Sequence, residues 1–110
     1  MMKVINISNE EYDVVVLGAG AAGLMAAITA AKNNKRILVL EKSNKVGKKI
    51  LMSGGGRCNF TNRYVESHHF ISKNPHFCKS ALTNYTPQDF ITLVEQHAIE
   101  YEERKHHQLF

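Results

Sequence analysis

The segment YDVVVLGAGAAG, residues 12–23, decides the fold of this 110-residue chain. It begins with an apolar run, Val14 to Leu17, that is mostly β-branched and is typical of a strand buried on both faces of a parallel sheet. A glycine-rich turn follows this run. Further along, the apolar stretch RILVLE at residues 36–41 predicts a second strand. Two parallel strands need a crossover connection, which is expected to be right-handed.

A helix is expected in that crossover, from about residue 21 to residue 34, because the sequence AAGLMAAITAAKNN is rich in strong helix formers. Four of its apolar residues fall on one helical face: Leu24, Ala27, Ile28 and Ala31. Strand, helix and strand then make a βαβ unit. The predicted fold class is therefore α/β. We expect a partial Rossmann-like FAD/NAD(P)-binding domain that consists of this N-terminal βαβ unit and further helices.

The chain after the second strand is expected to be less regular. Residues 42–72 are dense in glycine, asparagine, lysine and serine, which predicts a long functional loop with a short helical turn at residues 48–52. A helix is predicted from about residue 75 to residue 84, and another after Thr86, which is spaced from Asp89 as in a capping box. Residues 99–103 predict a strand. The inner face of the second helix is expected to consist of Phe90, Leu93, Val94 and His97.

Composition is that of an ordinary soluble globular chain, with 44% hydrophobic and 22% charged residues. The N-terminus has no apolar signal-peptide core, and the longest mostly apolar run is too short to span a bilayer. A cytoplasmic protein without a membrane partner is therefore expected. The two cysteines lie twenty positions apart in the sequence, without a CxxC pair or a histidine at ligand spacing, so we expect no metal site.

The net charge of +4 comes partly from a basic cluster. Its members are Lys42, Lys45, Lys48, Lys49, Arg57 and Arg63. Such a cluster suits an anionic ligand such as a pyrophosphate. No basic helix or aromatic-studded sheet accompanies the charge, so the sequence predicts no nucleic-acid partner.

Three glycines, Gly18, Gly20 and Gly23, follow the first strand in the G-x-G-x-x-G pattern of a dinucleotide-binding turn. The first is expected to make the tight turn, the second to let a pyrophosphate approach the backbone, and the third to let the helix pack closely on the sheet. The helix N-terminus, with Ala21 and Ala22, presents free N–H groups to the phosphates. Glu41 ends the second strand and is expected to accept hydrogen bonds from an adenosine ribose, which favours FAD or NAD over NADP.

A second glycine cluster, SGGGRCNFTN, does not match a P-loop. Together with DVVVLGAGAAGLMAAITAAK and ILVLEKSNKVGKKILM, it resembles the start of the BaiN-type flavoproteins, NAD(P)/FAD-dependent oxidoreductases that include bile-acid enone reductases. The resemblance is strong from residue 12 to about residue 62 and weaker to residue 110. It implies an FAD-binding oxidoreductase that passes hydride from NAD(P)H through the flavin to an unsaturated or oxo substrate.

The resemblance also implies where FAD lies. The FAD pyrophosphate is expected at the first glycine cluster and the ribose at Glu41. Three residues are expected beside the adenosine diphosphate: Lys42, Gly47 and Lys49. The residues expected to run toward the flavin ring are Ser53, Gly54, Gly55, Gly56, Arg57, Cys58 and Asn59. From the residues themselves, three glycines permit positive φ near a planar ligand, and an arginine stabilises charge on a reduced flavin. A flexible surface loop is the alternative for this second stretch.

Flavin-dependent disulfide reductases place a second cysteine five positions after the first, where this chain has Arg63. Dithiol chemistry is therefore not expected, and Cys58 is interpreted as a small packed side chain. The adjacent pairs His68–His69 and His106–His107 are interpreted as exposed loop histidines. No acid–base pair or activated nucleophile is visible, so no catalytic residue is assigned.

Residues 1–11 are expected to be an N-terminal extension. Two strands do not complete a doubly wound sheet, which needs several more. Residues 12–110 are therefore expected to be the N-terminal part of a truncated FAD/NAD(P)-binding domain. Two other functions stay open. One is an NAD-dependent dehydrogenase without flavin, and the other is a non-catalytic nucleotide-binding fragment.

Overall fold

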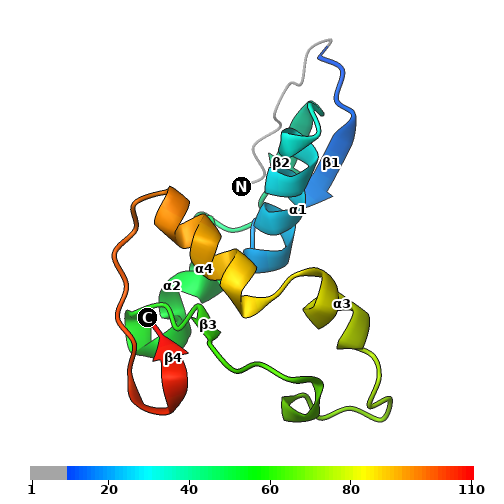
Figure 1. The fold of residues 1–110 in the computed structure, drawn as a ribbon. Helices are drawn as coiled ribbons and strands as arrows, with labels where there is room; N and C mark the ends of the chain where they lie inside the picture. The colour runs from blue at the N-terminus through cyan, green and yellow to red at the C-terminus, as the bar shows by residue number, and fades with distance from the viewer. Residues whose placement is uncertain (1–9) are drawn as a thin grey trace. The chain divides into compact units, whose positions relative to one another are not determined.

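The computed structural model describes residues 10–110, which form two compact units divided between residues 50 and 51 (Figure 1). Residues 1–9 of the predicted N-terminal extension lie outside the described residues. The first unit contains a two-stranded parallel sheet with its connecting helix, and the second contains further helices and a small antiparallel sheet.

The first unit is the predicted βαβ unit. Strand β1 (Val14–Leu17) pairs in parallel with β2 (Ile37–Leu40), and the connecting helix α1 (Ala21–Lys32) contacts both strands (Figure 1). The α/β prediction is therefore confirmed. The expectation that β1 is buried on both faces is wrong for the described residues, because Val15 and Leu17 are 53% and 80% exposed. Helix α1 covers only one face of a strand whose side chains alternate.

Helix α1 ends two residues earlier than predicted, since Asn34 adopts a left-handed φ of 56° that ends the helical path. The prediction of its inner face is correct for two of the four residues. Leu24 and Ala27 are half-buried, whereas Ile28 and Ala31 are exposed. A sheet of two strands offers too little surface to cover the whole apolar face of a twelve-residue helix.

Helix α2 (Lys48–Gly56) begins in the first unit and ends in the second. Its helical part is the predicted turn at residues 48–52. Ser53 is extended at ψ 154°, and the three glycines that follow have φ values of 58°, 68° and 88°. The helical path thus ends at Ser53, and the glycines that follow have the positive φ values that the sequence predicts.

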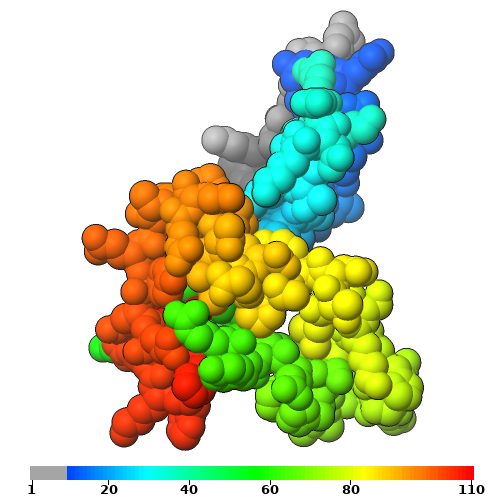
Figure 2. All heavy atoms as spheres, viewed as in Figure 1, coloured from blue at the N-terminus to red at the C-terminus, as the bar shows by residue number. Residues whose placement is uncertain are grey.

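The second unit pairs two very short strands, β3 (Thr61–Asn62) and β4 (Gln108–Leu109), in antiparallel register. Figure 2 shows the red C-terminal segment against the green β3 segment. Two 3₁₀ turns, η1 (Ser67–His69) and η2 (Lys105–His107), also belong to this unit. Within residues 10–110, no helix has the length and apolar character needed to cross a membrane.

Helix α4 (Pro87–Gln96) has the predicted capping box, in which the Thr86 hydroxyl accepts from the Asp89 N–H and the Asp89 carboxylate accepts from the Thr86 N–H. Helix α3 (Lys79–Asn84) begins four residues later than predicted. Residues 75–78 form turns instead, with the Lys79 N–H donating to the His76 carbonyl.

The core of the second unit forms where α4 meets the small sheet. Leu109 and Ile91 are fully buried, and Phe60 packs edge-on against Phe90 and Tyr101 at ring-centre distances of 5.7 and 5.6 Å. Val94 is also buried, as predicted. The prediction that His97 faces inward is wrong: it is exposed because it lies at the C-cap, beyond the last turn of α4.

The predicted strand at residues 99–103 is also wrong over most of its length. Ile99 is exposed, and residues 99–101 are in no ladder. The backbone of Glu102 exchanges two hydrogen bonds of 3.0 Å with that of Phe110, and Glu103 forms an isolated bridge with Leu109. Tight turning at η2 limits this pairing to a few residues.

Candidate functional site

The turn between β1 and α1 has the backbone expected of its first and third glycines. Gly18 has a φ of 101°, and its N–H donates to the Leu40 carbonyl at 2.7 Å, which ties the turn to the end of β2. A Cβ placed on Gly23 lies only 1.9 Å from the Gly18 carbonyl oxygen and 3.1 Å from Val16 Cγ1. Gly18 therefore makes the turn, and Gly23 permits the close approach of helix and strand.

Gly20 differs from these two because no described atom crowds it. A Cβ on Gly20 meets no heavy atom within 4 Å, and its φ of −84° suits any residue. Gly20 is the N-cap of α1, without a side-chain cap and without an acidic residue in the first turn. Ala21 and Ala22 are exposed. The first-turn N–H groups and the positive end of the helix dipole thus face open space, an arrangement that suits an anion.

Glu41 fixes the turn from the end of β2. One carboxylate oxygen accepts from the Ala19 N–H at 2.7 Å, and the other accepts from the Ser43 N–H at 2.8 Å. These bonds, that from Ser43 first and that from Ala19 next, hold the pKa of the Glu41 carboxyl below its ordinary value. A carboxylate has about four acceptor positions, so capacity remains for a ligand hydroxyl. The structural role in holding Ala19 is additional to the predicted ribose contact.

Gly47 completes this arrangement. It is buried, has a φ of 65°, and donates its N–H to the Ala19 carbonyl at 2.8 Å. The structure therefore brings Gly47, Glu41 and the first glycine turn together around Ala19. Lys42 and Lys49 are exposed and form no ion pair with any residue of the described range 10–110. Both ammonium groups are available to an anion.

The dependence of the unfolding free energy on pH, measured in the acidic range, tests the role of Glu41. Because its pKa is lowered in the folded protein, its hydrogen bonds stabilise the fold above the ordinary value of 4.5, and this contribution is lost as the pH falls through the lowered value. Glu41→Gln is expected to be less stable than the wild type at pH 7, with the difference shrinking below pH 4.5. Urea unfolding followed by circular dichroism, at neutral and acidic pH, measures this difference. A difference that does not change with pH contradicts the assignment.

The second group of predicted residues, Ser53 to Asn59, lies in the second unit. A Cβ on Gly54 lies 2.7 Å from the backbone nitrogen of Asn59 and 2.7 Å from Phe110 Cε1. Packing therefore requires a glycine at this position. Gly55 and Gly56 have open space at the same position. Arg57 is exposed and has no ion-pair partner within the described part of the chain.

Cys58 and Asn59 close the loop that follows the glycines. Cys58 has a left-handed φ of 58°, is half-buried, and donates its N–H to the Ser53 carbonyl at 3.0 Å. With its amide nitrogen directed at two carbonyl oxygens, Asn59 donates to Leu109 at 3.1 Å and to Thr61 at 3.2 Å. The loop is therefore internally bonded, which a freely flexible loop is not.

Sequence reasoning missed a pocket in the second unit. Its lining includes His69, His106 and His107, which the sequence treats only as exposed loop histidines. They are exposed as predicted, but distant segments bring them together around Asn62 and Tyr64. No spacing in the sequence indicates this, because the histidine pairs are 38 positions apart.

Comparisons with known proteins agree with the geometry of the glycine turn. Residues 12–110 match the family described as "HI0933-like protein Rossmann domain". The chain is 52% identical over 101 residues to "Ribosomal RNA dihydrouridine synthase" of Escherichia coli K12, and 53% identical over 96 residues to the protein of that name in Haemophilus influenzae. These matches cover 92% and 87% of this chain but 25% and 24% of the relatives.

A more distant relative is "3-dehydro-bile acid delta(4,6)-reductase" of Clostridium scindens. It is 36% identical over 72 residues, which are 64% of this chain and 18% of the relative. The chain thus spans about a quarter of the length of the first two relatives. With the βαβ unit, the G-x-G-x-x-G turn and a family match over residues 12–110, the chain belongs to the HI0933-like Rossmann-domain family.

Proposed function

We propose that this chain is the FAD-binding part of a flavoprotein reductase that saturates uridine in ribosomal RNA. The observation that carries the cofactor assignment is the open N-terminus of α1 behind Gly20, where nothing in the described chain competes with a pyrophosphate. The substrate assignment is supported by the names of the two relatives that are 52% and 53% identical to this chain. Activity belongs to the whole protein, of which this chain is proposed to supply the nucleotide site.

The described residues fit FAD. Gly18, Gly20 and Gly23, with the N–H groups of Ala21 and Ala22, are proposed to hold the pyrophosphate. Glu41 is anchored in place by Ala19 and Ser43 and retains acceptor capacity for the ribose. Lys42, Gly47 and Lys49 are proposed to lie beside the adenosine diphosphate. The residues from Ser53 to Asn59 are proposed to run toward the flavin ring, with the exposed Arg57 placed to stabilise negative charge on it.

Bound FAD supplies two-electron chemistry, in which a hydride is delivered to an acceptor. The overall reaction balances as uridine plus NAD(P)H plus a proton, giving dihydrouridine plus NAD(P)⁺. The names of the first two relatives and of the bile-acid reductase describe related chemistry, since all involve two hydrogens added to an unsaturated carbon–carbon bond. Uridine is preferred to a steroid because the identity is 52–53% in the first case and 36% in the second.

The sequence prediction that nucleic acid is not a partner loses its support here, because two close relatives are named for an action on ribosomal RNA. The basic cluster is compatible with an RNA partner, since residues 42–63 contain six cationic side chains and no carboxylate. One of the six, Arg63, is occupied by the Glu103 carboxylate at 2.6 Å. The remaining five are exposed. Three of them, Lys42, Lys49 and Arg57, are proposed to lie beside FAD, which leaves Lys45 and Lys48 for RNA.

The test uses the whole protein encoded by the gene. The purified protein is expected to carry a flavin absorbance that survives desalting, and the released cofactor is expected to be FAD. Incubation with NADPH or NADH and ribosomal RNA from cells lacking the gene is expected to produce dihydrouridine, measured by mass spectrometry of the digested RNA. Reactions without nicotinamide are the control, and comparison of NADPH with NADH identifies the donor.

Three outcomes contradict the proposal in different ways. A protein that binds NAD tightly and no FAD supports an NAD-dependent dehydrogenase instead. A yellow protein that leaves uridine intact but reduces a 3-oxo-4,6-diene steroid redirects the substrate assignment. A protein that binds neither cofactor lacks the proposed function.

A further inference from the structure

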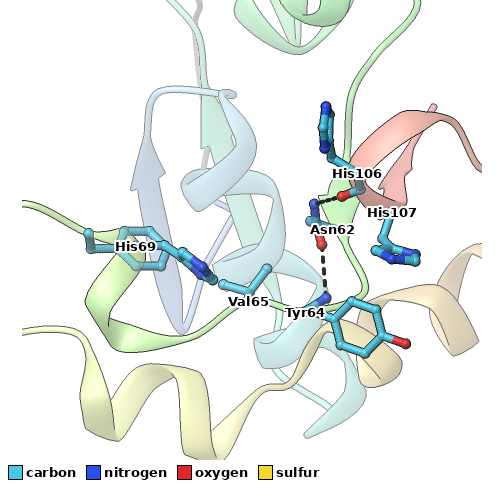
Figure 3. A pocket seen from close by; sticks show the side chains of 7 residues that line it. Asn62, Tyr64, Val65, His69, His106 and His107 are labelled. Carbon is cyan, nitrogen blue, oxygen red and sulfur yellow. Dashed lines mark hydrogen bonds between the residues drawn. The ribbon is translucent and has the colours of Figure 1, made fainter.

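A pocket of about 510 Å³ lies in the second unit, outside the proposed FAD site. This volume is in the range of small-molecule sites, which hold roughly 300–1,000 Å³. Asn62 lines it from β3 and Tyr64 from the segment that follows (Figure 3). His69 lines it from the end of η1, and His106 and His107 from η2. Residues more than forty positions apart in the sequence thus surround one space.

Aromatic surface dominates the walls. The Tyr64 ring is packed at 90° against the His107 ring, with 4.6 Å between the ring centres, yet Tyr64 remains 62% exposed. Phe70 also lines the pocket and is 41% exposed. Edge-on support from His107 holds the Tyr64 ring in place while its face stays open. Such a supported, open aromatic face is suited to stacking with a planar heterocycle.

Polar edges accompany the aromatic faces. His107 Nδ1 lies 2.8 Å from a Glu103 carboxylate oxygen, and His69 Nδ1 accepts from the Glu66 N–H at 3.1 Å. The Nε2 atoms of both rings have no partner among residues 10–110, and the His106 ring has none at either nitrogen. The pocket therefore offers oriented imidazole edges that can donate or accept hydrogen bonds.

The backbone that presents two of these rings is strained and firmly held. His106 and His107 both have φ values of 60°, a conformation that residues other than glycine rarely adopt. The Asn62 amide holds them there: its nitrogen donates to the His106 carbonyl at 2.6 Å, and its oxygen accepts from the Tyr64 N–H at 2.9 Å (Figure 3). Strain of this kind is concentrated at ligand sites.

We infer that this pocket receives one unstacked uracil base of an RNA strand, an inference that rests on the proposed function. Uracil is a planar ring with carbonyl oxygens that accept and an N–H that donates. It therefore matches an open tyrosine face bordered by imidazole edges. Single-stranded RNA is generally recognised in this manner, by stacking on aromatic side chains and bonding to the exposed base edges. The pocket then selects a splayed uridine.

The test compares two fluorescent probes on the FAD-loaded whole protein. One is an oligouridylate of about twelve nucleotides and the other is an abasic oligonucleotide with the same number of phosphates. Anisotropy titration is expected to show that the wild type binds the oligouridylate roughly tenfold or more tightly than the abasic strand. Equal affinities overturn the inference, because phosphate attraction alone then explains binding.

Two variants locate the effect in the pocket. Tyr64→Ala removes the stacking face, and His106→Gly removes a ring while relieving the left-handed strain, so the fold is retained. Both are expected to lose the preference for oligouridylate and to bind the abasic strand as before. Ala98→Gly, at another left-handed position with φ 52°, and His76→Ala, an exposed histidine outside the lining, are matched controls that keep the preference.

The flavin absorbance of each sample separates the two proposals. If FAD is bound and dihydrouridine forms while His106→Gly and Tyr64→Ala keep the preference, the pocket assignment is wrong and the proposed function stands. If no FAD is bound, the proposed function fails whatever the pocket variants do.

Discussion

Gly23→Ala is expected to lower the free energy of unfolding by about 3 kcal/mol or more, since the added methyl carbon lies 1.9 Å from the Gly18 carbonyl oxygen. That oxygen belongs to the backbone of a turn held on both sides. The Gly18 N–H is bonded to Leu40, and Ala19 is bonded to both Glu41 and Gly47. The turn therefore cannot move aside without breaking bonds at the end of β2. Relief requires α1 to separate from β1.

Urea unfolding of FAD-free protein, followed by circular dichroism, measures this effect without a contribution from bound ligand. Gly20→Ala is the matched control, because the same methyl group three positions earlier meets no heavy atom within 4 Å. Its unfolding free energy is expected within about 0.5 kcal/mol of the wild type. A Gly23→Ala protein as stable as Gly20→Ala contradicts the close helix–strand approach.

The βαβ unit was predictable because its signals are local. A β-branched run, a glycine at each turn position and a stretch of helix formers occur in uninterrupted order, and the capping box of Thr86 and Asp89 is a similarly local pattern. Each element follows from residues within a few positions of one another. These are the elements that the structure reproduces with boundaries shifted by no more than two residues.

Long-range partners were not predictable in the same way. The spacing of Glu41 from the glycines indicates a ribose contact, but its bond to the Ala19 N–H depends on how β2 ends beside the turn. The same limit applies to β3 and β4, two strands of two residues each that pair across 46 positions of sequence. Such short strands have no periodicity of their own, so only the folded chain identifies them.

The histidine pocket shows the limit most clearly. His106 and His107 are adjacent, and adjacent side chains normally point in different directions. Two successive left-handed residues change those directions, and the Asn62 amide stabilises the result from the other strand. Histidine is enriched among non-glycine residues with positive φ, but most histidines have negative φ, so the sequence does not single out His106 and His107. The Asn62 contact joins residues 44 positions apart and has no local signal.

Gly20→Val is expected to weaken FAD binding by roughly a hundredfold or more while leaving the fold intact, a loss of about 2.7 kcal/mol in binding free energy. Gly20 has an extended backbone, φ −84° and ψ −173°, in which a β-branched residue is favoured. A Cβ at residue 20 meets no heavy atom within 4 Å. The valine methyl groups therefore exclude only a ligand that approaches the first-turn N–H groups of α1.

Titration of the FAD-free protein by quenching of flavin fluorescence measures the affinity, and urea unfolding of the same samples measures the fold. Gly20→Ala is expected to give an intermediate loss, since it adds one carbon instead of three. Ala31→Val adds two methyl groups at an exposed position near the other end of α1 and is expected to bind FAD as the wild type does. A loss of FAD affinity that grows from Gly20→Ala to Gly20→Val indicates direct contact between residue 20 and FAD, because steric exclusion increases with the volume added at that position.

The combination of outcomes decides between a packing role and a ligand role for this glycine. If Gly20→Val binds FAD normally, the pyrophosphate does not approach the turn, and the cofactor assignment for the whole first glycine cluster is wrong. If it loses both stability and FAD, Gly20 is needed by the fold in the way that Gly23 is. Only loss of FAD with unchanged unfolding free energy fits an open helix N-terminus kept free for phosphate, because the chain itself gains nothing from the missing side chain at residue 20.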